Sequence, residues 1–96
     1  MALPSLINKH RTEILALAKK HGAHNLRVFG SMSRGDYSAD SDIDFLVEVR
    51  GPTSPWFPAG MIQDLEDLLG RSVDVVTPNA LHPLIRDEAL NAGIPL

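Results

Sequence analysis

The amino-acid sequence predicts a small domain of the α/β (or α+β) class. The chain has 96 residues, which is close to the lower limit for one independently folding domain. Its 44% hydrophobic and 22% charged residues are the composition of an ordinary globular protein. Helical and strand patterns alternate along the chain in the order α, β, α, β, α, β, α. We therefore expect one domain over residues 1–96, with at least three strands flanked by helices.

The first third of the chain predicts a helix, a strand and a turn-rich connection. Apolar residues recur at spacings of three, four and seven from Leu3 to Lys20, which is typical of an amphipathic helix. Gly22 follows two lysines and is a typical helix stop. A strand is expected from Leu26 to Phe29. Residues 31–41 are small and polar, and we expect them to begin with a short helix.

The rest of the chain contains two further strands and two further helices. Residues 42–49 are rich in β-branched and apolar types and predict the second strand. Residues 51–58 hold three prolines and a glycine and are expected to form a loop. A helix is predicted from Ala59 to Leu69, a strand from Ser72 to Val76, and a final helix from Leu81 to Leu90. The pattern alone does not fix the strand topology.

Charge and cysteine content narrow the possible classes of function. The formal net charge is −3, and the nine Lys and Arg residues are scattered without a basic stripe, which disfavours direct nucleic-acid binding. The sequence has no cysteine and no apolar stretch long enough to span a membrane, so we expect a soluble, cytoplasmic protein. Because so short a chain buries a small core without disulfides, homo-oligomerisation is a further expectation.

The most informative pattern is Gly30-Ser31 followed, after ten residues, by Asp42-Ile43-Asp44. A glycine at the end of a strand lets the backbone approach a ligand, and a serine at a helix start offers donors to phosphate. Two aspartates at i and i+2 on a strand point to the same face, where both can contact hard cations such as Mg²⁺. Asp74 lies within an otherwise apolar strand. If the strands are neighbours, three carboxylates converge, as two-metal phosphoryl chemistry requires.

Each acidic residue also has a purely structural interpretation. Asp42 could cap a turn after Ser41, and Asp44 could lie on a solvated strand face. Asp74 could face outward on an edge strand or pair with Arg71. The same holds for Arg34, which follows the Gly-Ser pair and could form a salt bridge with Asp36 or Asp40 instead of binding a ligand.

The histidines and the aromatic loop residues carry weaker signals. The four histidines share no metal-ligand spacing, and we expect them at the surface or at helix ends (His10, His21, His24 and His82). Trp56 and Phe57 lie in the proline-rich loop. We expect both to pack under the loop as a local cluster rather than to anchor a partner.

These residues together resemble the minimal nucleotidyltransferases of the DNA polymerase beta superfamily. The matching residues are Gly30, Ser31, a ten-residue spacer that contains Arg34 and Gly35, then Asp42, Asp44 and Asp74. The resemblance extends over nearly the whole chain. It implies the DNA polymerase beta-like fold, a small mixed sheet with flanking helices.

The resemblance also implies a role for each matching residue. Asp42, Asp44 and Asp74 correspond to the family's catalytic carboxylates, which hold two Mg²⁺ ions. Asp74 corresponds to the carboxylate that binds the catalytic ion and can accept the proton of the attacking hydroxyl. Gly30 and Ser31 correspond to the pair that grips phosphate, and Arg34 is a further nucleotide-binding candidate.

The implied activity is transfer of a nucleoside monophosphate from a triphosphate, with ATP as the expected donor, to a hydroxyl group with release of pyrophosphate. The family points to the antitoxin of a toxin-antitoxin pair, in which a HEPN-type toxin is both partner and substrate. Two alternatives stay open. The chain could be a non-catalytic antitoxin that inhibits its partner by occlusion, or it could modify a small molecule.

Overall fold

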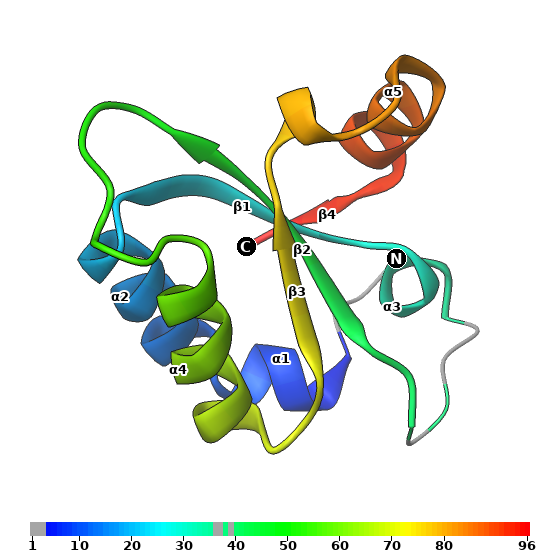
Figure 1. The fold of residues 1–96 in the computed structure, drawn as a ribbon. Coiled ribbons are helices and arrows are strands. Elements are labelled where there is room, and N and C mark those ends of the chain that lie inside the picture. The colour runs from blue at the N-terminus through cyan, green and yellow to red at the C-terminus, as the bar shows by residue number, and fades with distance from the viewer. Residues whose placement is uncertain (1–3, 36–37, 39) are drawn as a thin grey trace.

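The computed structural model describes residues 4–35, 38 and 40–96 and contains a four-stranded sheet with helices on both faces (Figure 1). The strands are β1 (Ala23–Phe29), β2 (Ile43–Val49), β3 (Val73–Val76) and β4 (Ile94–Pro95). The helices are α1 (Ser5–Lys9), α2 (Arg11–Lys20), α3 (Ser31–Arg34), α4 (Ala59–Leu69) and α5 (Pro83–Ala92), with one 3-10 turn, η1 (Pro78–Ala80). In the described part of the chain, no helix is long and apolar enough to cross a membrane.

The sheet is mixed and has the order β3-β2-β1-β4. β1 pairs antiparallel with β2 and β4, whereas β2 pairs parallel with β3. The parallel pair is joined through α4, the helical crossover that parallel neighbours need. The expected sheet of at least three strands is therefore confirmed. The short strand β4 was not predicted.

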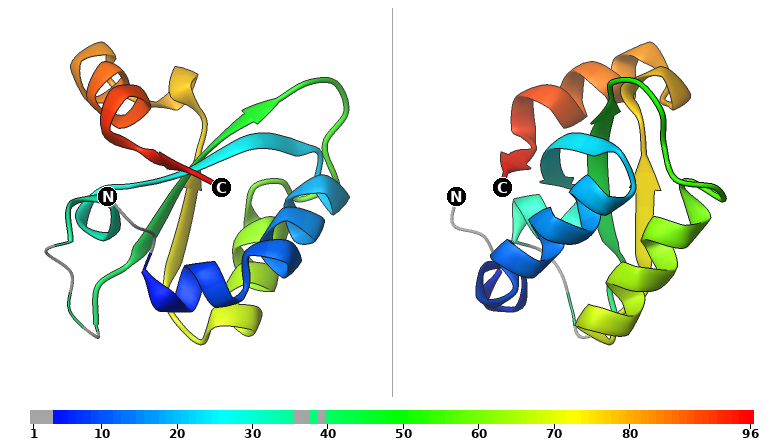
Figure 2. Two further views of the ribbon diagram at one scale, coloured as in Figure 1. Left: turned by 180° about the vertical axis from the view of Figure 1, so that it is seen from behind. Right: turned by 90° about the vertical axis from the view of Figure 1, so that its left-hand side faces the viewer.

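The core lies between one face of the sheet and the helices α1, α2 and α4 (Figure 2). On β2, Ile43, Phe45 and Val47 are fully buried, as the predicted alternation requires. The helix α4 adds Met61 and Leu65, which are likewise buried. The helix α5 lies across the opposite face of the sheet and contacts β1.

Two local features of the fold differ from the prediction. The helix expected from Leu3 to Lys20 is two helices that meet at His10, and Leu3 lies outside the described residues. Ile7 and Ile14, which are seven residues apart, both reach the core. The apolar spacing therefore does not reveal the break between the two helices. The strand β1 begins at Ala23, earlier than expected, because Ala23 and His24 already pair with β2. The register then shifts between His24 and Arg27, where Asn25 has φ 51°.

His21 is a buried hydrogen-bonded residue rather than a surface one. It ends α2 and is only 6% exposed. Its Nδ1 lies 2.5 Å from Ser54 Oγ, and its Nε2 lies 2.7 Å from Asp64 Oδ2. Hydrogen bonds from His21 and then from Lys20 hold the pKa of the Asp64 carboxyl below its ordinary value of 3.8. This network ties residues 51–58 to α2 and α4.

The two aromatic residues of the 51–58 loop, Trp56 and Phe57, lie in different environments. Phe57 packs against the core, as expected. Trp56 does not, because it is 85% exposed at a positive φ of 67°. The prediction that both pack under the loop is therefore wrong for Trp56.

We predict that His21→Ala lowers the free energy of unfolding by about 1–3 kcal/mol, because Ser54 and Asp64 lose their shared partner. Urea unfolding of the parent and the variant measures the difference. The matched control is His24→Ala, whose side chain is exposed on β1. Equal stability of the two variants would show that the network does not hold the loop.

Candidate functional site

Three strands place the key residues in one row across the sheet. Phe29 pairs with Asp44 in the antiparallel β1-β2 ladder, and Asp44 pairs with Asp74 in the parallel β2-β3 ladder. Residues directly opposite one another in a sheet have their side chains on the same face. The sequence left open whether the strands that carry Asp44 and Asp74 are neighbours. They are neighbours in the structure, and the two carboxylates share one face of the sheet.

Gly30 lies against the side chain of Asp44. It ends β1 at φ 69° and ψ −147°, a conformation that is nearly exclusive to glycine. A Cβ atom built at this position would lie 2.7 Å from Asp44 Oδ2. The backbone conformation therefore favours glycine here, and any larger residue would force the Asp44 carboxylate to shift.

Asp42 lies just before β2, at the end of a turn that Arg71 fixes. The Arg71 guanidinium donates to the carbonyl of Ser38 at 3.0 Å and to the carbonyl of Ser41 at 2.5 Å. A parallel-ladder bond from the Ile43 amide to the Ser72 carbonyl, at 2.9 Å, adds a second tie. Arg71 thus bonds to the backbone of this turn, whereas the structural interpretation had paired it with Asp74.

Asp74 lies on the edge strand β3 and is exposed. This agrees with half of its structural interpretation, that of an outward residue on an edge. Its Oδ1 accepts a bond from the Val75 amide at 3.0 Å. Its neighbour in the ladder is nevertheless Asp44. Asp74 can therefore lie on an edge strand and still belong with Asp42 and Asp44 to one group of carboxylates, here called the acidic row.

The electrostatics of Asp44 are those of a crowded carboxylate. Burial raises the pKa of Asp44 above its ordinary value of 3.8, and the charges of Asp74 and Asp42 raise it further. The positive charge of Arg34 lowers the same pKa. Asp42 and Asp74 are therefore each close enough to repel the charge of Asp44, and Arg34 is close enough to offset part of that repulsion.

The chemistry of this donor set suits a divalent cation. Carboxylate oxygens are the ligands that Mg²⁺ prefers, and a bound cation would remove the mutual repulsion of the three groups. Within residues 4–35, 38 and 40–96, no three acidic or histidine side chains already converge as a coordination cluster. Asp42 and Asp74 are both exposed, so a cation from solvent can reach their carboxylates.

The helix α3 carries the remaining predicted residues. Ser31 is its first residue and Arg34 its last. The Gly30 carbonyl accepts bonds from the amides of Ser33 and Arg34, at 3.1 and 3.3 Å, which closes the tight turn after β1. The alternative pairing of Arg34 with Asp36 falls on a residue outside the described part of the chain.

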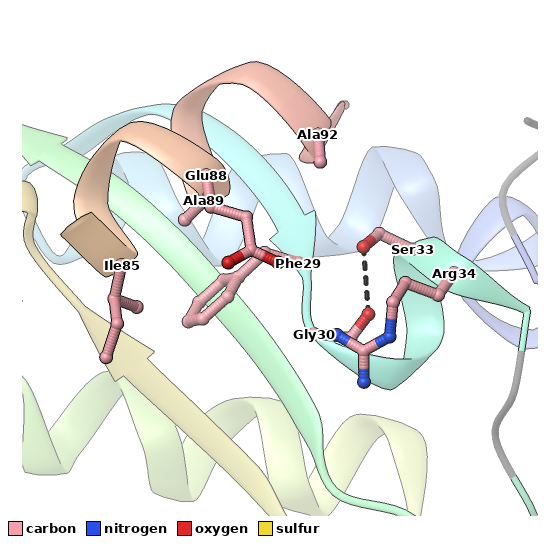
Figure 3. A pocket seen from close by; sticks show the side chains of 8 residues that line it. All are labelled: Phe29, Gly30, Ser33, Arg34, Ile85, Glu88, Ala89 and Ala92. Atoms are coloured by element: carbon pink, nitrogen blue, oxygen red, sulfur yellow. Dashed lines mark hydrogen bonds between the residues drawn. The ribbon is translucent and has the colours of Figure 1, made fainter.

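A cavity of about 210 Å³ adjoins this turn between β1, α3 and α5 (Figure 3). It is lined by Phe29, Gly30, Ser33, Arg34, Ile85, Glu88, Ala89 and Ala92. The sequence analysis selected only Gly30 and Arg34 from this set. Phe29 could have been found, because it immediately precedes the Gly-Ser pair on a predicted strand. The α5 residues gave no signal, since only the packing of α5 across the sheet brings them to the cavity.

A glycine turn set against paired carboxylates, on a small mixed sheet, defines the class of nucleotidyl-transferring enzymes. Comparison with known proteins leads to the same class. Residues 7–96 match the family described as "Nucleotidyltransferase domain". The chain belongs to this family and is a nucleotidyltransferase.

The most similar relatives include two archaeal proteins. MJ0435 of Methanocaldococcus jannaschii, provisionally named a protein adenylyltransferase, is 38% identical over 92% of this chain and 95% of its own length. The protein adenylyltransferase MntA of Thermococcus cleftensis is 34% identical over 82% of this chain and 77% of its own.

Two solved structures share the fold. One, provisionally described as a minimal nucleotidyltransferase, has a TM-score of 0.85 and 38% identity, and the match covers 100% of this chain and 97% of that one. A toxin-antitoxin structure with AMP-PNP has a TM-score of 0.73 and covers 88% of this chain and 69% of that chain. Its identity is 22%, so it supports the fold alone. The DNA polymerase beta-like fold expected from the sequence is confirmed.

We predict that Gly30→Ala abolishes nucleotide binding, because its Cβ displaces the Asp44 carboxylate from the turn. The matched control is Gly70→Ala. Gly70 has a similar φ of 66° but a ψ of 25°, and no atom lies within 4 Å of its built Cβ, so Gly70→Ala measures the cost of left-handed backbone alone, about 1–2 kcal/mol. Gly30, at ψ −147°, carries a larger backbone cost as well as the clash. Titration with ATP and Mg²⁺ measures binding, and thermal melts measure stability. Wild-type affinity in Gly30→Ala would contradict the prediction.

Proposed function

We propose that this chain is a magnesium-dependent adenylyltransferase that transfers AMP from ATP to a hydroxyl of a HEPN-type toxin and acts as its antitoxin. The observation that carries the proposal is the contact between the Gly30 turn and Asp44, which stands in register with Asp74. The turn that we assign to phosphate therefore lies directly beside a carboxylate pair, and this arrangement supports nucleotidyl transfer.

Asp42, Asp44 and Asp74 are the proposed metal-binding and catalytic residues. Two Mg²⁺ ions held by them would polarise the α-phosphate and neutralise charge on the leaving pyrophosphate. Asp74, which is exposed on the edge strand, is placed where an acceptor from another molecule can approach. We assign it the role of receiving the proton of the attacking hydroxyl.

Gly30, Ser31 and Arg34 are the proposed nucleotide-binding residues. The amides of Ser33 and Arg34 already bond to the Gly30 carbonyl, so within the four-residue helix α3 we assign the amide and hydroxyl of Ser31 as donors to phosphate oxygens. Arg34 adds a positive charge within reach of Asp44, at the same turn. These groups would hold the β- and γ-phosphates while the acceptor oxygen forms a bond to the α-phosphorus and the bond to pyrophosphate breaks.

The acceptor assignment is supported by the relatives rather than by the site. Similar proteins are named protein adenylyltransferases, and a structure of the same fold is a toxin-antitoxin complex with AMP-PNP. A protein acceptor also fits the open position of Asp74 on the edge strand, because it can bring its own surface to the site.

We predict that labelled AMP passes from ATP to the HEPN-type partner in the presence of Mg²⁺, and that Asp44→Asn and Asp74→Asn each reduce the rate more than about 100-fold. Substitution of an outer-shell partner of a metal typically lowers metal affinity or activity ~10–100-fold, and substitution of a direct ligand should lower it more. Asp67→Asn is the matched control, since Asp67 is exposed on α4, where its carboxylate accepts a hydrogen bond from Gln63. Autoradiography of the separated proteins measures transfer.

The same experiment distinguishes the other two functions. A non-catalytic antitoxin would form a complex with the toxin and inhibit it without labelling it, even when all three aspartates are intact. A small-molecule transferase would leave the toxin both unlabelled and uninhibited. Either outcome would overturn the proposed transfer to protein.

We predict that Asp44→Asn melts at or above the parent temperature in chelator, because it removes one charge from a repelling group. Mg²⁺ with ATP should reverse the order. A ligand that binds only the folded state stabilises it by about 2.7 kcal/mol at one hundred times Kd, and the variant should lose most of this gain. Thermal melts with and without the ligands measure both effects. A lower melting temperature of Asp44→Asn in chelator would indicate a structural role instead.

A further inference from the structure

The cavity between β1, α3 and α5 continues the candidate site rather than forming a separate one. Gly30 and Arg34, which we assign to the triphosphate, line one end of it. Phe29 lines it as well and stands in register with Asp44, so the cavity and the carboxylates share one face of the sheet. A molecule held by the Gly30 turn can therefore extend into the cavity without leaving that face.

The walls of the cavity are apolar where it is farthest from α3. Phe29 forms one wall from β1, and Ile85 and Ala89 come from α5 (Figure 3). Ile85 is 51% exposed, which leaves an aliphatic side chain open to solvent at the cavity. An aromatic side chain facing aliphatic ones is a surface on which a flat ring can pack.

The two ends of the cavity carry opposite charges. Arg34 enters it from α3, and Glu88 enters it from α5 with its carboxylate pointing toward Phe29 (Figure 3). A carboxylate is an acceptor-only group and repels phosphate, whereas a guanidinium attracts phosphate. The Arg34 end thus suits the anionic tail of a ligand, and the Glu88 end suits a part that donates hydrogen bonds.

The size of the cavity indicates how much of a nucleotide it can hold. At about 210 Å³ it is smaller than the ~300–1,000 Å³ of pockets that enclose whole ligands. It can hold one part of a nucleoside triphosphate while the rest lies over the turn at Gly30. Only the nucleoside combines a flat ring with hydrogen-bond donors.

We propose that this cavity is the nucleoside subsite, with Phe29 and Ile85 packing against the base and Glu88 accepting a hydrogen bond from the nucleoside. The inference rests on the proposed function, because it places the triphosphate on the Gly30 turn. Glu88 becomes a residue that determines which nucleotide is used. The donor on the nucleoside is either a ribose hydroxyl or the exocyclic amine of the base, and both present the same chemistry to a carboxylate.

The test is a set of binding titrations in Mg²⁺ with the parent, Glu88→Ala and Asp87→Ala. Asp87 is the matched control, because it is an exposed acidic residue next to Glu88 on α5 that does not line the cavity. The ligands are ATP, 2′-deoxy-ATP, 3′-deoxy-ATP, ITP and inorganic triphosphate. Each variant removes one surface charge, so general electrostatic effects are matched.

We expect Glu88→Ala to weaken ATP binding about ten-fold or more, as is typical when a hydrogen bond to a charged group is lost. Binding of inorganic triphosphate should not weaken, because it has no nucleoside. One of the three altered nucleotides should bind the parent about ten-fold more weakly than ATP, and this difference should nearly vanish in Glu88→Ala. A loss with either deoxy-nucleotide identifies the ribose, and a loss with ITP identifies the amine.

Three results would overturn the subsite. Glu88→Ala could match Asp87→Ala for every ligand, or it could weaken inorganic triphosphate as much as ATP. It could also leave ATP binding intact while slowing transfer to the partner, which would make the cavity an acceptor site. In each case the parent still binds triphosphate, so the proposed function survives. If the parent binds neither ATP nor triphosphate, both proposals fail together.

Discussion

The burial of alternate side chains along β2 is the constraint on which the site depends. Ile43, Phe45 and Val47 are completely buried under the helices. Because side chains alternate along a strand, this burial fixes Asp44 on the opposite face. A slip of one residue would move the carboxylate into the core, where an unpaired charge costs several kcal/mol. Core packing thus holds Asp44 in register with both Phe29 and Asp74.

The same register creates a conflict between stability and function. Three carboxylates lie near one another, and their repulsion and the burial of Asp44 disfavour its charged form. The positive charge of Arg34 offsets part of this repulsion. Arg71, the nearest cation in sequence to Asp74, is bonded to the carbonyls of Ser38 and Ser41. It therefore fixes the turn before Asp42 and leaves the acidic row available to a cation.

Local sequence patterns selected the candidate site residues because each signal lies within a short segment. Gly30 and Ser31 are adjacent, Asp42 and Asp44 are two apart, and Asp74 interrupts an apolar strand. Each of these signals depends on the backbone period or on glycine's conformational freedom, which can be seen in a single chain segment. The order of the strands was not predicted, because it depends on pairing between distant segments; the structure gives it as β3-β2-β1-β4.

The features that were missed all depend on contacts between distant segments. His21 is buried because residues 51–58 and α4 close over it, and Ser54 lies 33 positions away. The strand β4 is two residues long and exists through its pairing with β1. Trp56 is carried outward by a positive φ that the loop imposes on a bulky side chain. No periodicity within one segment reports such contacts.

The charges at the candidate site couple the binding of a metal cation to the binding of a nucleoside triphosphate. The chain has a net charge of −3, and its acidic row lies beside the turn assigned to an anionic triphosphate. Without a cation, Asp44 and its neighbours repel that triphosphate, and Arg34 offsets only one of these charges. A cation between them is attracted by both anions, so each ligand strengthens the binding of the other by the same factor. Under the proposed function, nucleotide and metal would bind as one unit, which would let a small acidic protein hold a nucleotide without a basic surface.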